Sequence, residues 1–332
     1  MSPSRKRRRS LRGQSSNRLA TRIVKGDQVV FITGAGLSVS SGVKPFRGDS
    51  GIWNEVIWKT ATRACFRKDP LAWYNDFWLP YFSNMDPKPN TGHSVLKALQ
   101  DMFPDTCHII TQNVDGLQQG KNVIEAHGRI GYFKCLPAVD SDTDSDDDDD
   151  DDRPVHLGHR RKRSNWKMGK KCRFQQMDSL AESEIEPSSV RKALKTKQPQ
   201  LDSPPVCPQC RRPVPPQALL FDEGYHAHDF YQFMEMERLL ANARVIVFIG
   251  TSFNVTITSV ALDHARSKRI PVFNFNTVDF LEPSAILDVE NIVGKSDDTL
   301  SQLLSDVKEL LGDSKEESNS VDEPSKRIKV RL

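Results

Sequence analysis

The polar segment 111–128, with the sequence TQNVDGLQQGKNVIEAHG, contains the residue types that proton-transfer chemistry uses. Gln112, Asn113 and Asp115 follow an apolar run, and His127 has an alanine before it and a glycine after it. Imidazole titrates near neutral pH, so histidine is the usual general base there. The small neighbours leave the ring open to a ligand, and we predict that His127 is a catalytic base with Asn113 beside it. The alternatives are a structural histidine and, for Asp115, a turn residue before a glycine.

A second chemical feature is the segment Val29–Ser38, VVFITGAGLS, in which an apolar run leads directly into a turn of small residues. Glycines at 34–36 let the backbone approach a phosphate closely. The loop does not satisfy GxGxxG, because Val39 occupies the third glycine position. A tight strand-to-helix turn is the alternative interpretation. Phe46 and Arg47 follow shortly afterwards and offer an aromatic face and a guanidinium that could close over a phosphate or carboxylate.

Buried strands separated by helices must position these residues. Short apolar, β-branched runs of this kind predict strands that are buried on both faces. Strands alternating with helical stretches indicate an α/β fold, a Rossmann-like parallel sheet with helices on both faces. Such sheets bind ligands at the carboxyl ends of their strands, where the polar residues stand. The predicted strands are Gln28–Thr33, Cys107–Thr111, Asn122–Glu125, Arg244–Ile249 and Pro271–Phe275, and the predicted helices are His93–Asp101, Phe230–Ala241 and a closing helix through Leu300–Leu311.

Two stretches interrupt this alternation. Gly51–Phe82 contains four of the five tryptophans and predicts a compact helical core, because aromatic side chains supply large buried areas. The alternative is that some of these aromatics form the wall of a substrate cleft. The stretch Cys135–Cys210 contains runs of charge and several potential metal ligands.

The net charge of +3 conceals strong segregation of charge along the chain. Blocks of like charge repel and rarely fold, so they predict tails and loops. Basic clusters of this length favour nuclear import, with contact to nucleic acid or a solubilising tail as alternatives. No apolar run approaches the ~18 residues that cross a bilayer. The basic clusters are Arg5–Arg9, His159–Arg163 and Lys326–Arg331, and the acidic ones are Asp146–Asp152 and Glu316–Glu323.

Taken together, the motifs resemble those of the sirtuins, NAD-dependent protein deacylases. The resemblance covers roughly residues 22–312 and rests on motifs in the family's order. TQNVDGL followed by EAHG at this spacing is specific. The motifs are GAGLS with Ser41-Gly42, Phe46-Arg47, TQNVDGL, EAHG, a Cys-Pro-x-Cys pair, Gly250-Thr251-Ser252 and Asn274-Phe275-Asn276.

The resemblance implies a role for each matching residue. His127 would take a proton from the ribose hydroxyls of NAD, Asn113 would orient the ribose and a water, and Asp115 would hold the nicotinamide amide. Phe46 would shield the site after nicotinamide leaves. Further residues implied to bind NAD are Gly34, Ala35, Gly36, Ser38, Arg47 and Gln112 near the phosphates and reactive ribose, and Gly250, Thr251, Ser252, Asn274, Asn276 and, less securely matched, Lys295 and Ser296 near the adenosine.

The resemblance also implies a structural zinc site, and here the chain departs from the family. Cys207 and Cys210 form a two-residue-spaced knuckle, but the pair that should begin at Cys135 has alanine in place of its second cysteine. Cys172, His156 or His159 could supply the fourth ligand, and Cys172 is favoured because thiolate is the usual structural ligand of zinc. The alternative is a site without metal. Cys65 and Cys107 are predicted to be buried thiols.

The domain limits that follow are a basic disordered tail at 1–21, a Rossmann-like domain at 22–129 and 217–312, a zinc module at 130–216 and a disordered tail at 313–332. The helical stretch at about 50–90 is assigned to the small domain, and 140–203 is predicted to be mostly disordered. Two departures bear on substrate: Lys44-Pro45 replaces the family's usual residues, and Asp222 replaces the glycine of the family's substrate loop. The added negative charge would favour a basic peptide.

The predicted function is that of a nuclear NAD-dependent protein-lysine deacetylase acting on acetylated proteins, with histone tails and chromatin as candidate partners and no membrane partner. Acetyl is expected because Trp73–Phe82 lacks the Tyr-x-x-Arg pair of members that prefer acidic acyl groups. The alternatives are a chromatin scaffold that binds NAD or ADP-ribose with little turnover, and a protein mono-ADP-ribosyltransferase.

Overall fold

The computed structural model describes residues 17–45, 55–82, 87–136, 172, 179–185, 190–196, 199–279, 281–284 and 287–320. Several sequence predictions therefore fall outside the described residues. They are Phe46, Arg47, His156, His159, and the charge clusters at 5–9, 146–152, 159–163 and 326–331.

A six-stranded parallel sheet forms the larger half of the molecule, with the strand order β3-β2-β1-β7-β8-β9. Its central strand β1 pairs with β2 on one side and with β7 on the other. The five strands predicted from the sequence are confirmed to within one residue at each end. The strands are β1 (Val29–Thr33), β2 (Cys107–Thr111), β3 (Val123–Glu125), β7 (Val245–Ile249), β8 (Val272–Asn276) and β9 (Val289–Val293).

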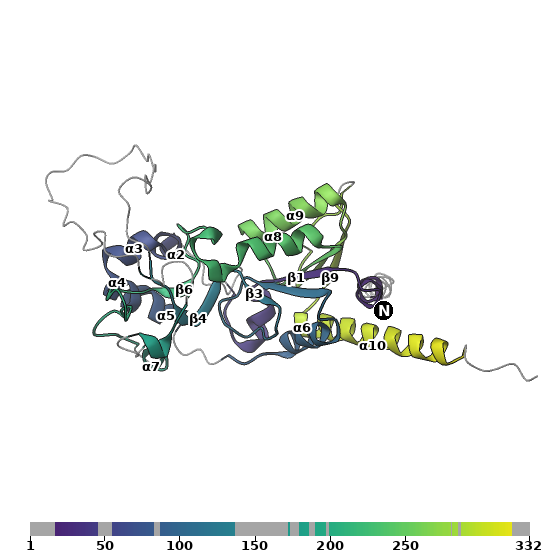
Figure 1. The fold of residues 1–332 in the computed structure, drawn as a ribbon, viewed down its shortest axis with the longest axis horizontal. Coiled ribbons are helices and arrows are strands. Elements are labelled where there is room, and N and C mark those ends of the chain that lie inside the picture. Colours follow the sequence, from purple (N-terminus) through teal and green to yellow (C-terminus); the bar gives the residue numbers. More distant parts are fainter. Residues whose placement is uncertain are drawn as a thin grey trace, which may run out of the picture.

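Helices cover both faces of this sheet (Figure 1). Helices α8 (Phe233–Asn242) and α9 (Thr256–Lys268) lie on one face, and α6 (Thr91–Met102) and α10 (Ser296–Ser320) lie on the other. Alternate residues of β1 serve the two faces, because successive side chains of a strand point in opposite directions. Val30 and Ile32 belong to the core beneath α8 and α9, whereas Val29 and Phe31 belong to the core beneath α6 and α10.

The smaller half combines a short antiparallel sheet with helices (Figure 1). Trp73, Tyr74, Phe77 and Trp78 are all buried there, which confirms the predicted aromatic core. Trp58 differs, since 52% of it is exposed. The elements are β4 (Gly128–Phe133), β5 (Leu180–Ala181) and β6 (Pro216–Ala218), in the order β5-β4-β6, with α2 (Glu55–Thr60), α3 (Arg63–Lys68), α4 (Pro70–Ala72), the π-helix η2 (Trp73–Trp78), α5 (Leu79–Phe82) and α7 (Val190–Leu194).

The predictions of disorder are wrong at the edges of the predicted segments. Residues 17–24 are helical, because Leu19 and Ile23 are fully buried and Arg18 forms an ion pair with Asp288 at 2.5 Å. Helix α10 continues to Ser320, eight residues into the predicted C-terminal tail.

The predicted insertion at 140–203 also contains ordered structure. Strand β5, a 3-10 turn (Glu182–Glu184) and α7 lie within it. Leu180, Ile185 and Val190 are buried in the core of the small domain, so apolar burial stabilises this part of the insertion despite its polar composition.

Candidate active site and metal centre

The turns that follow β1 and β7 pack backbone against backbone at the carboxyl edge of the sheet. Gly34 donates its N–H to the carbonyl of Ile249 (2.9 Å), and Gly36 donates to that of Gly250 (2.8 Å). A Cβ added at Gly36 would lie 2.6 Å from the Gly250 Cα, so no larger residue fits without movement. These two N–H groups are therefore satisfied within the protein, and the glycines act by allowing the turns to meet.

The crevice between these turns is where an open α/β sheet binds ligands. After β1 the chain proceeds outward through β2 and β3, whereas β7, β8 and β9 extend in the other direction. The order reverses between β1 and β7, and such a switch point opens a crevice outside the carboxyl ends of the strands. The sequence prediction placed the ligand at this edge, and Gly34, Ala35 and Gly250 stand there.

The polar residues after β2 converge on the same crevice. The Asn113 amide donates to the Gly34 carbonyl (3.0 Å) and to the Ser38 hydroxyl (3.2 Å). Ser38 in turn donates to the Asp115 carboxylate at 2.7 Å, and the Gln112 amide lies 3.4 Å from the Thr251 hydroxyl. A hydrogen-bonded group thus links three strands that are distant in sequence, and it fixes the orientation of each side chain before any ligand arrives.

A second histidine, His93, contacts this hydrogen-bonded group through Ser38. It was not predicted from the sequence as a site residue. His93 is buried at the start of α6, and its Nε2 lies 3.3 Å from the Ser38 hydroxyl. Asn90 caps the helix by accepting from the His93 backbone, and its own N–H donates to the His93 Nδ1 at 3.2 Å. Burial lowers the pKa of His93, so the ring is neutral at pH 7. The Asn-Thr-Gly-His spacing of a capping box was the signal available in the sequence.

His127 lies between β3 and β4, at the edge where the large and small halves meet. Burial lowers its pKa to about 4, while a hydrogen bond to the Gln112 backbone acts in the opposite direction. The imidazole is therefore neutral at pH 7 and able to accept a proton. Its Nε2 lies 3.0 Å from the hydroxyl of Tyr225, a contact across 98 positions of sequence.

The residues predicted near the adenosine divide into two groups. Asn276 ends β8 and donates its amide to the Thr251 carbonyl at 2.9 Å, so it lies at the crevice with Ser252. Ser296 is the first residue of α10. Two positions earlier, the Gly294 N–H donates to the Asn276 carbonyl at 2.8 Å. Asn274 differs: it is fully buried within β8, and its amide donates to Asn291 of β9. Asn274 therefore lies inside the sheet, where it links β8 to β9.

One buried hydroxyl at this edge is left without a partner in the part of the chain that the structure describes. The Thr33 hydroxyl, one residue before the glycine turn, is buried and has no hydrogen-bond partner among the described residues. A buried polar group without a partner is costly unless a ligand or water satisfies it. Together with the close glycine turns and the amides around Ser38, this orphaned hydroxyl fits NAD at this edge.

Four cysteines form a candidate zinc centre in the small domain. The thiol sulfurs of Cys135, Cys172, Cys207 and Cys210 all lie within 4.8 Å of one another. The Cys135–Cys210 pair is 3.4 Å apart and the Cys172–Cys207 pair 3.6 Å apart. Tetrahedral zinc with bonds of about 2.3 Å places its sulfurs about 3.8 Å apart, so the cluster fits the metal. Among the described residues, the structure thus places Cys172 with the other three cysteines.

The segment that resembles a substrate loop is anchored on both sides. Asp222 accepts from the backbone N–H groups of Arg63 (2.6 Å) and Ala64 (3.0 Å) at the start of α3. The Arg63 guanidinium also lies 3.7 Å from this carboxylate. Asp222 is thus held at the start of α3 beside a guanidinium, and its effect on peptide preference stays a prediction.

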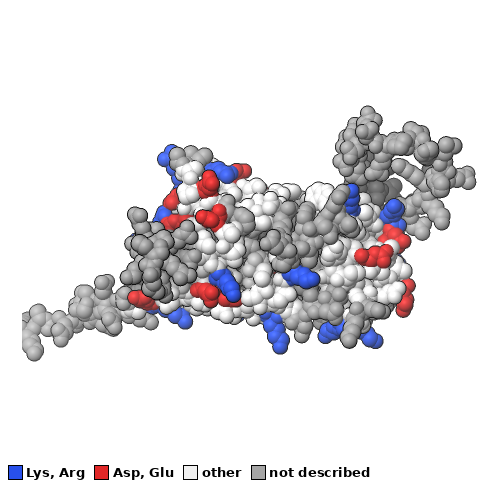
Figure 2. All heavy atoms as spheres, turned by 180° about the vertical axis from the view of Figure 1, so that it is seen from behind, with Lys and Arg blue, Asp and Glu red and all other residues white. Residues whose placement is uncertain are grey.

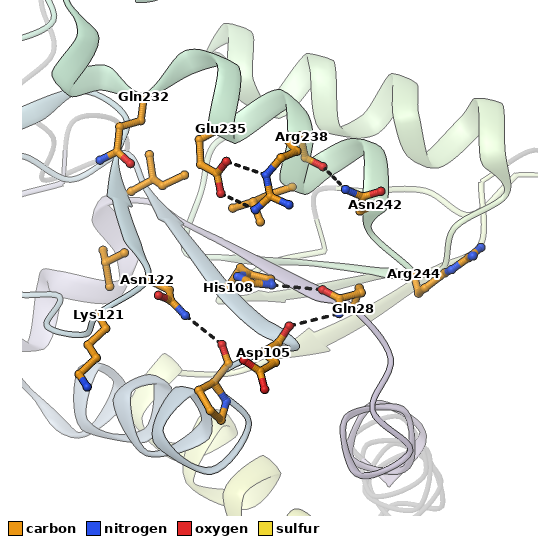
Figure 3. A pocket seen from close by; sticks show the side chains of 14 residues that line it. Gln28, Asp105, His108, Lys121, Asn122, Gln232, Glu235, Arg238, Asn242 and Arg244 are labelled. Carbon is orange, nitrogen blue, oxygen red and sulfur yellow. Dashed lines mark hydrogen bonds and ion pairs between the residues drawn. The ribbon is translucent and has the colours of Figure 1, made fainter.

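A polar groove of about 780 Å³ lies at the opposite, amino edge of the sheet, beside α8 (Figure 3). Gln28 precedes β1 there, and its side chain bonds His108 of β2 at 3.1 Å. Arg238 pairs with Glu235 on α8 at 2.5 Å. These groups satisfy one another and lie far along the strands from His127, so the groove does not contribute to the site.

Most of the charge blocks of the sequence lie outside the described residues. Figure 2 shows acidic and basic side chains interspersed on one face. Among the described helices, none is long and apolar enough to cross a bilayer.

Comparison with known proteins identifies relatives over most of the chain. The family described as the Sir2 family matches residues 34–257. An NAD-dependent deacetylase, sir2E of Dictyostelium discoideum, is 34% identical over 295 residues, which cover 86% of this chain and 75% of that protein. A Sir2 homologue solved in complex with NAD has a TM-score of 0.60 at 22% identity, covering 89% of this chain and 94% of the other. A Sir2 structure with a myristoylated histone peptide has a TM-score of 0.57 at 20% identity, covering 90% and 99%.

Proposed function

The chain belongs to the Sir2 family of NAD-dependent protein deacetylases and deacylases, and we propose that it removes acetyl groups from lysine side chains of nuclear proteins, histone tails among them. The observation that carries the proposal is that Asn113, Ser38 and Asp115 form one hydrogen-bonded group at the switch point of the sheet, while His127 hydrogen-bonds the backbone of Gln112, the neighbour of Asn113. A neutral base beside a cradle of amides is what transfer to a cofactor hydroxyl requires.

The reaction divides between cofactor and protein. NAD supplies the leaving nicotinamide and the ribose that receives the acyl group. Cleavage of that glycosidic bond needs positioning and a shielded site more than a strong protein nucleophile. His127 accepts a proton at Nε2, the ring atom that faces away from the Gln112 backbone.

The other residues orient and enclose. Asn113, already held by the Gly34 carbonyl and Ser38, presents its remaining amide oxygen to the ribose side. Asp115 is fixed by Ser38 and by the Leu117 N–H at 2.9 Å, so its carboxylate can meet an amide without reorganisation. Thr251 and Asn276 hold the other end of the crevice together.

The proposed preference for acetyl rests on two features of the helical segment: it lacks a Tyr-x-x-Arg pair, and its Tyr74 is buried. No Tyr-x-x-Arg pair occurs in Trp73–Phe82. Tyr74 is fully buried in the small domain and donates to the Val214 carbonyl at 2.7 Å, so it is not available to an acidic acyl group. The Sir2 structure with a myristoylated histone peptide supports lysine-bearing peptides as a substrate class.

The nuclear assignment rests on the sequence alone. Three basic clusters, at 5–9, 159–163 and 326–331, have the length and composition of import signals. Fusion of the full chain to a fluorescent protein, with and without alanines at all three clusters, tests it. We expect loss of nuclear accumulation when the signals are removed together.

The test of activity incubates the full chain with NAD and matched acetylated, succinylated and myristoylated histone peptides. Nicotinamide release and peptide mass are followed together. We expect release of nicotinamide in step with loss of acetyl, and much slower turnover of the succinylated peptide. Nicotinamide release with ADP-ribosylated protein and intact peptide would instead indicate ADP-ribosyl transfer, and no release would indicate a binding scaffold.

A further inference from the structure

The hydroxyl of Tyr225 lies directly against the base. Its oxygen is 3.0 Å from the Nε2 of His127, and the two rings are inclined by 28° with centroids 5.9 Å apart. Tyr225 begins a short 3-10 turn (Tyr225–Ala227), three residues after Asp222, which is held at the start of α3. Nothing in the local sequence indicates this contact.

The surroundings of His127 give this hydrogen bond a direction. The ring makes another hydrogen bond to the backbone of Gln112, whose N–H is already donated to the Thr33 carbonyl at 2.9 Å. The Gln112 carbonyl is therefore the acceptor, and the ring nitrogen facing it carries the proton. A neutral imidazole has one N–H and one lone pair, so Nε2 accepts and the Tyr225 hydroxyl donates.

The phenol is fixed in this position. Its ring stacks on Phe233 with centroids 5.7 Å apart and planes 18° apart. The backbone of Ile257, in the first turn of α9, also hydrogen-bonds the hydroxyl. Burial raises the pKa of Tyr225 to about 12, so the hydroxyl keeps its proton and remains a donor at neutral pH.

We propose that the Tyr225 hydroxyl occupies, in the cofactor-free protein, the position at the His127 Nε2 that a ribose hydroxyl of NAD takes on binding. Tyr225 is then a positioning residue that competes with the cofactor. The inference rests on the proposed function, in which Nε2 takes the proton of a ribose hydroxyl. One lone pair accepts one hydrogen bond well, so the two hydroxyls cannot both hold it.

The exchange has consequences for the free and the bound protein. In the free protein the hydrogen bond from the phenol favours the neutral imidazole. On binding, one hydroxyl replaces another at the same atom, and no proton is lost or gained. The hydrogen bond given up weakens NAD binding by about five-fold, equivalent to about 1 kcal/mol.

The experiment compares the full chain with Tyr225→Phe, which keeps the ring and its stacking and removes the hydroxyl. Calorimetric titration with NAD measures affinity without any peptide. Nitrogen NMR of the His127 ring in the cofactor-free protein reports the hydrogen bond directly. We expect NAD to bind about five-fold more tightly, and the Nε2 resonance to move toward that of a nitrogen without a donor.

Tyr74→Phe is the matched control, because it removes a buried phenol hydrogen bond in the small domain. It should keep the wild-type NAD affinity and the wild-type His127 resonance. A Tyr225→Phe variant with unchanged or weaker NAD affinity overturns the inference. So does slower turnover at unchanged NAD affinity, which would make the hydroxyl a proton relay.

The two proposals fail in different ways. If the wild-type chain neither binds NAD nor deacetylates, the proposed function is wrong and the competition falls with it. If the wild-type chain binds NAD and deacetylates while Tyr225→Phe matches it in affinity and in the His127 resonance, only the inference about Tyr225 is overturned.

Discussion

The carboxyl edge of the parallel sheet and the small domain both bury polar groups, but they satisfy them differently. At the edge, His127 has no ionic partner, and burial lowers its pKa to about 4. In the small domain, Lys134 and Glu223 are both fully buried and form an ion pair. For Glu223, burial acts to raise the pKa, but Lys134 and His228 outweigh it and lower the pKa to about 2.

The difference shows how the same desolvation produces opposite charge states. A buried group without a charged partner becomes neutral, whereas a buried group with one stays ionised. The Glu223 carboxylate accepts from Lys134, from Tyr231 (3.4 Å) and from the Leu220 backbone (3.2 Å), so it holds the segment after β6 permanently. The groups at the edge are neutral or share hydrogen bonds that a ligand can replace. The small domain, with its permanent ion pair, is therefore the holding region. The carboxyl edge of the sheet, where a ligand can replace protein hydrogen bonds, is the exchanging region.

Removal of the metal should have the largest effect, because the small domain depends on permanent partners. Structural zinc contributes on the order of 10 kcal/mol to folding. We expect Cys172→Ser to lose zinc to a chelator that leaves wild type loaded, and to melt far earlier. Cys65→Ser, at a half-buried thiol on α3, is the control. One zinc per chain in Cys172→Ser, with unchanged resistance to the chelator, would contradict the four-cysteine site.

Loss of the base should come next. Removal of a positioned general base typically costs about 10²–10⁴-fold in rate, so we expect His127→Ala to lose that much turnover with nearly unchanged NAD affinity. Initial rates on an acetylated peptide measure it. His108→Ala, in the groove at the opposite edge, is the matched control and should keep wild-type rates. Equal loss in both variants would show that His127 acts through folding.

Breaking the buried ion pair tests the holding region. Lys134→Met leaves the buried Glu223 charge without its lysine, with His228 at 3.3 Å as its remaining ion-pair partner among the described residues, so the cost approaches the ~3–5 kcal/mol of breaking a buried pair. The free energy of unfolding in urea measures it. The double variant Lys134→Met with Glu223→Gln should recover part of the loss, because no uncompensated charge remains. Lys97→Met breaks the exposed Lys97–Asp101 pair and should change stability by less than about 1 kcal/mol. If Lys134→Met also changed the free energy of unfolding by less than about 1 kcal/mol, the Lys134–Glu223 pair would not be buried in solution.

Much of the exchanging region could be predicted from the sequence, because its residues follow strands that are continuous apolar runs. Asn113, Asp115 and Ser38 meet because parallel strands end at one edge. The contact between His127 and Tyr225 could not be predicted, since it depends on where α9 and Phe233 lie. The roles of Phe46 and Arg47 stay predictions.

The holding region was harder to predict. Strands β4, β5 and β6 are short or contain glycine, so none has the apolar run that identifies a buried strand. The same holds for β9 of the parallel sheet, where the sequence VENIV mixes polar with apolar residues. The sequence left three candidates for the fourth zinc ligand, because spacing alone does not fix which segment returns to the knuckle. The contact of Asp222 with Arg63 could not be predicted for the same reason, since the two residues lie 159 positions apart.

Acid should weaken the two regions in different pH windows. The pKa of His127 is 6.5 in the unfolded chain and about 4 in the folded chain. The unfolded state therefore binds the extra proton, and stability is lost as pH falls from about 6.5 toward 4. The pKa of Glu223 is 4.5 in the unfolded chain and about 2 in the folded chain, so the contribution of Glu223 to stability persists down to about pH 4.5 and is lost below it.

The smallest predicted effect isolates the His127 window. Between pH 7.5 and pH 5, wild type should lose about 2 kcal/mol more stability than His127→Ala, as measured by urea unfolding at each pH. Other buried histidines titrate in both proteins and cancel in the difference. If His127→Ala loses as much stability as wild type, the ring is ionised in the folded protein, and the contrast between the two regions does not hold.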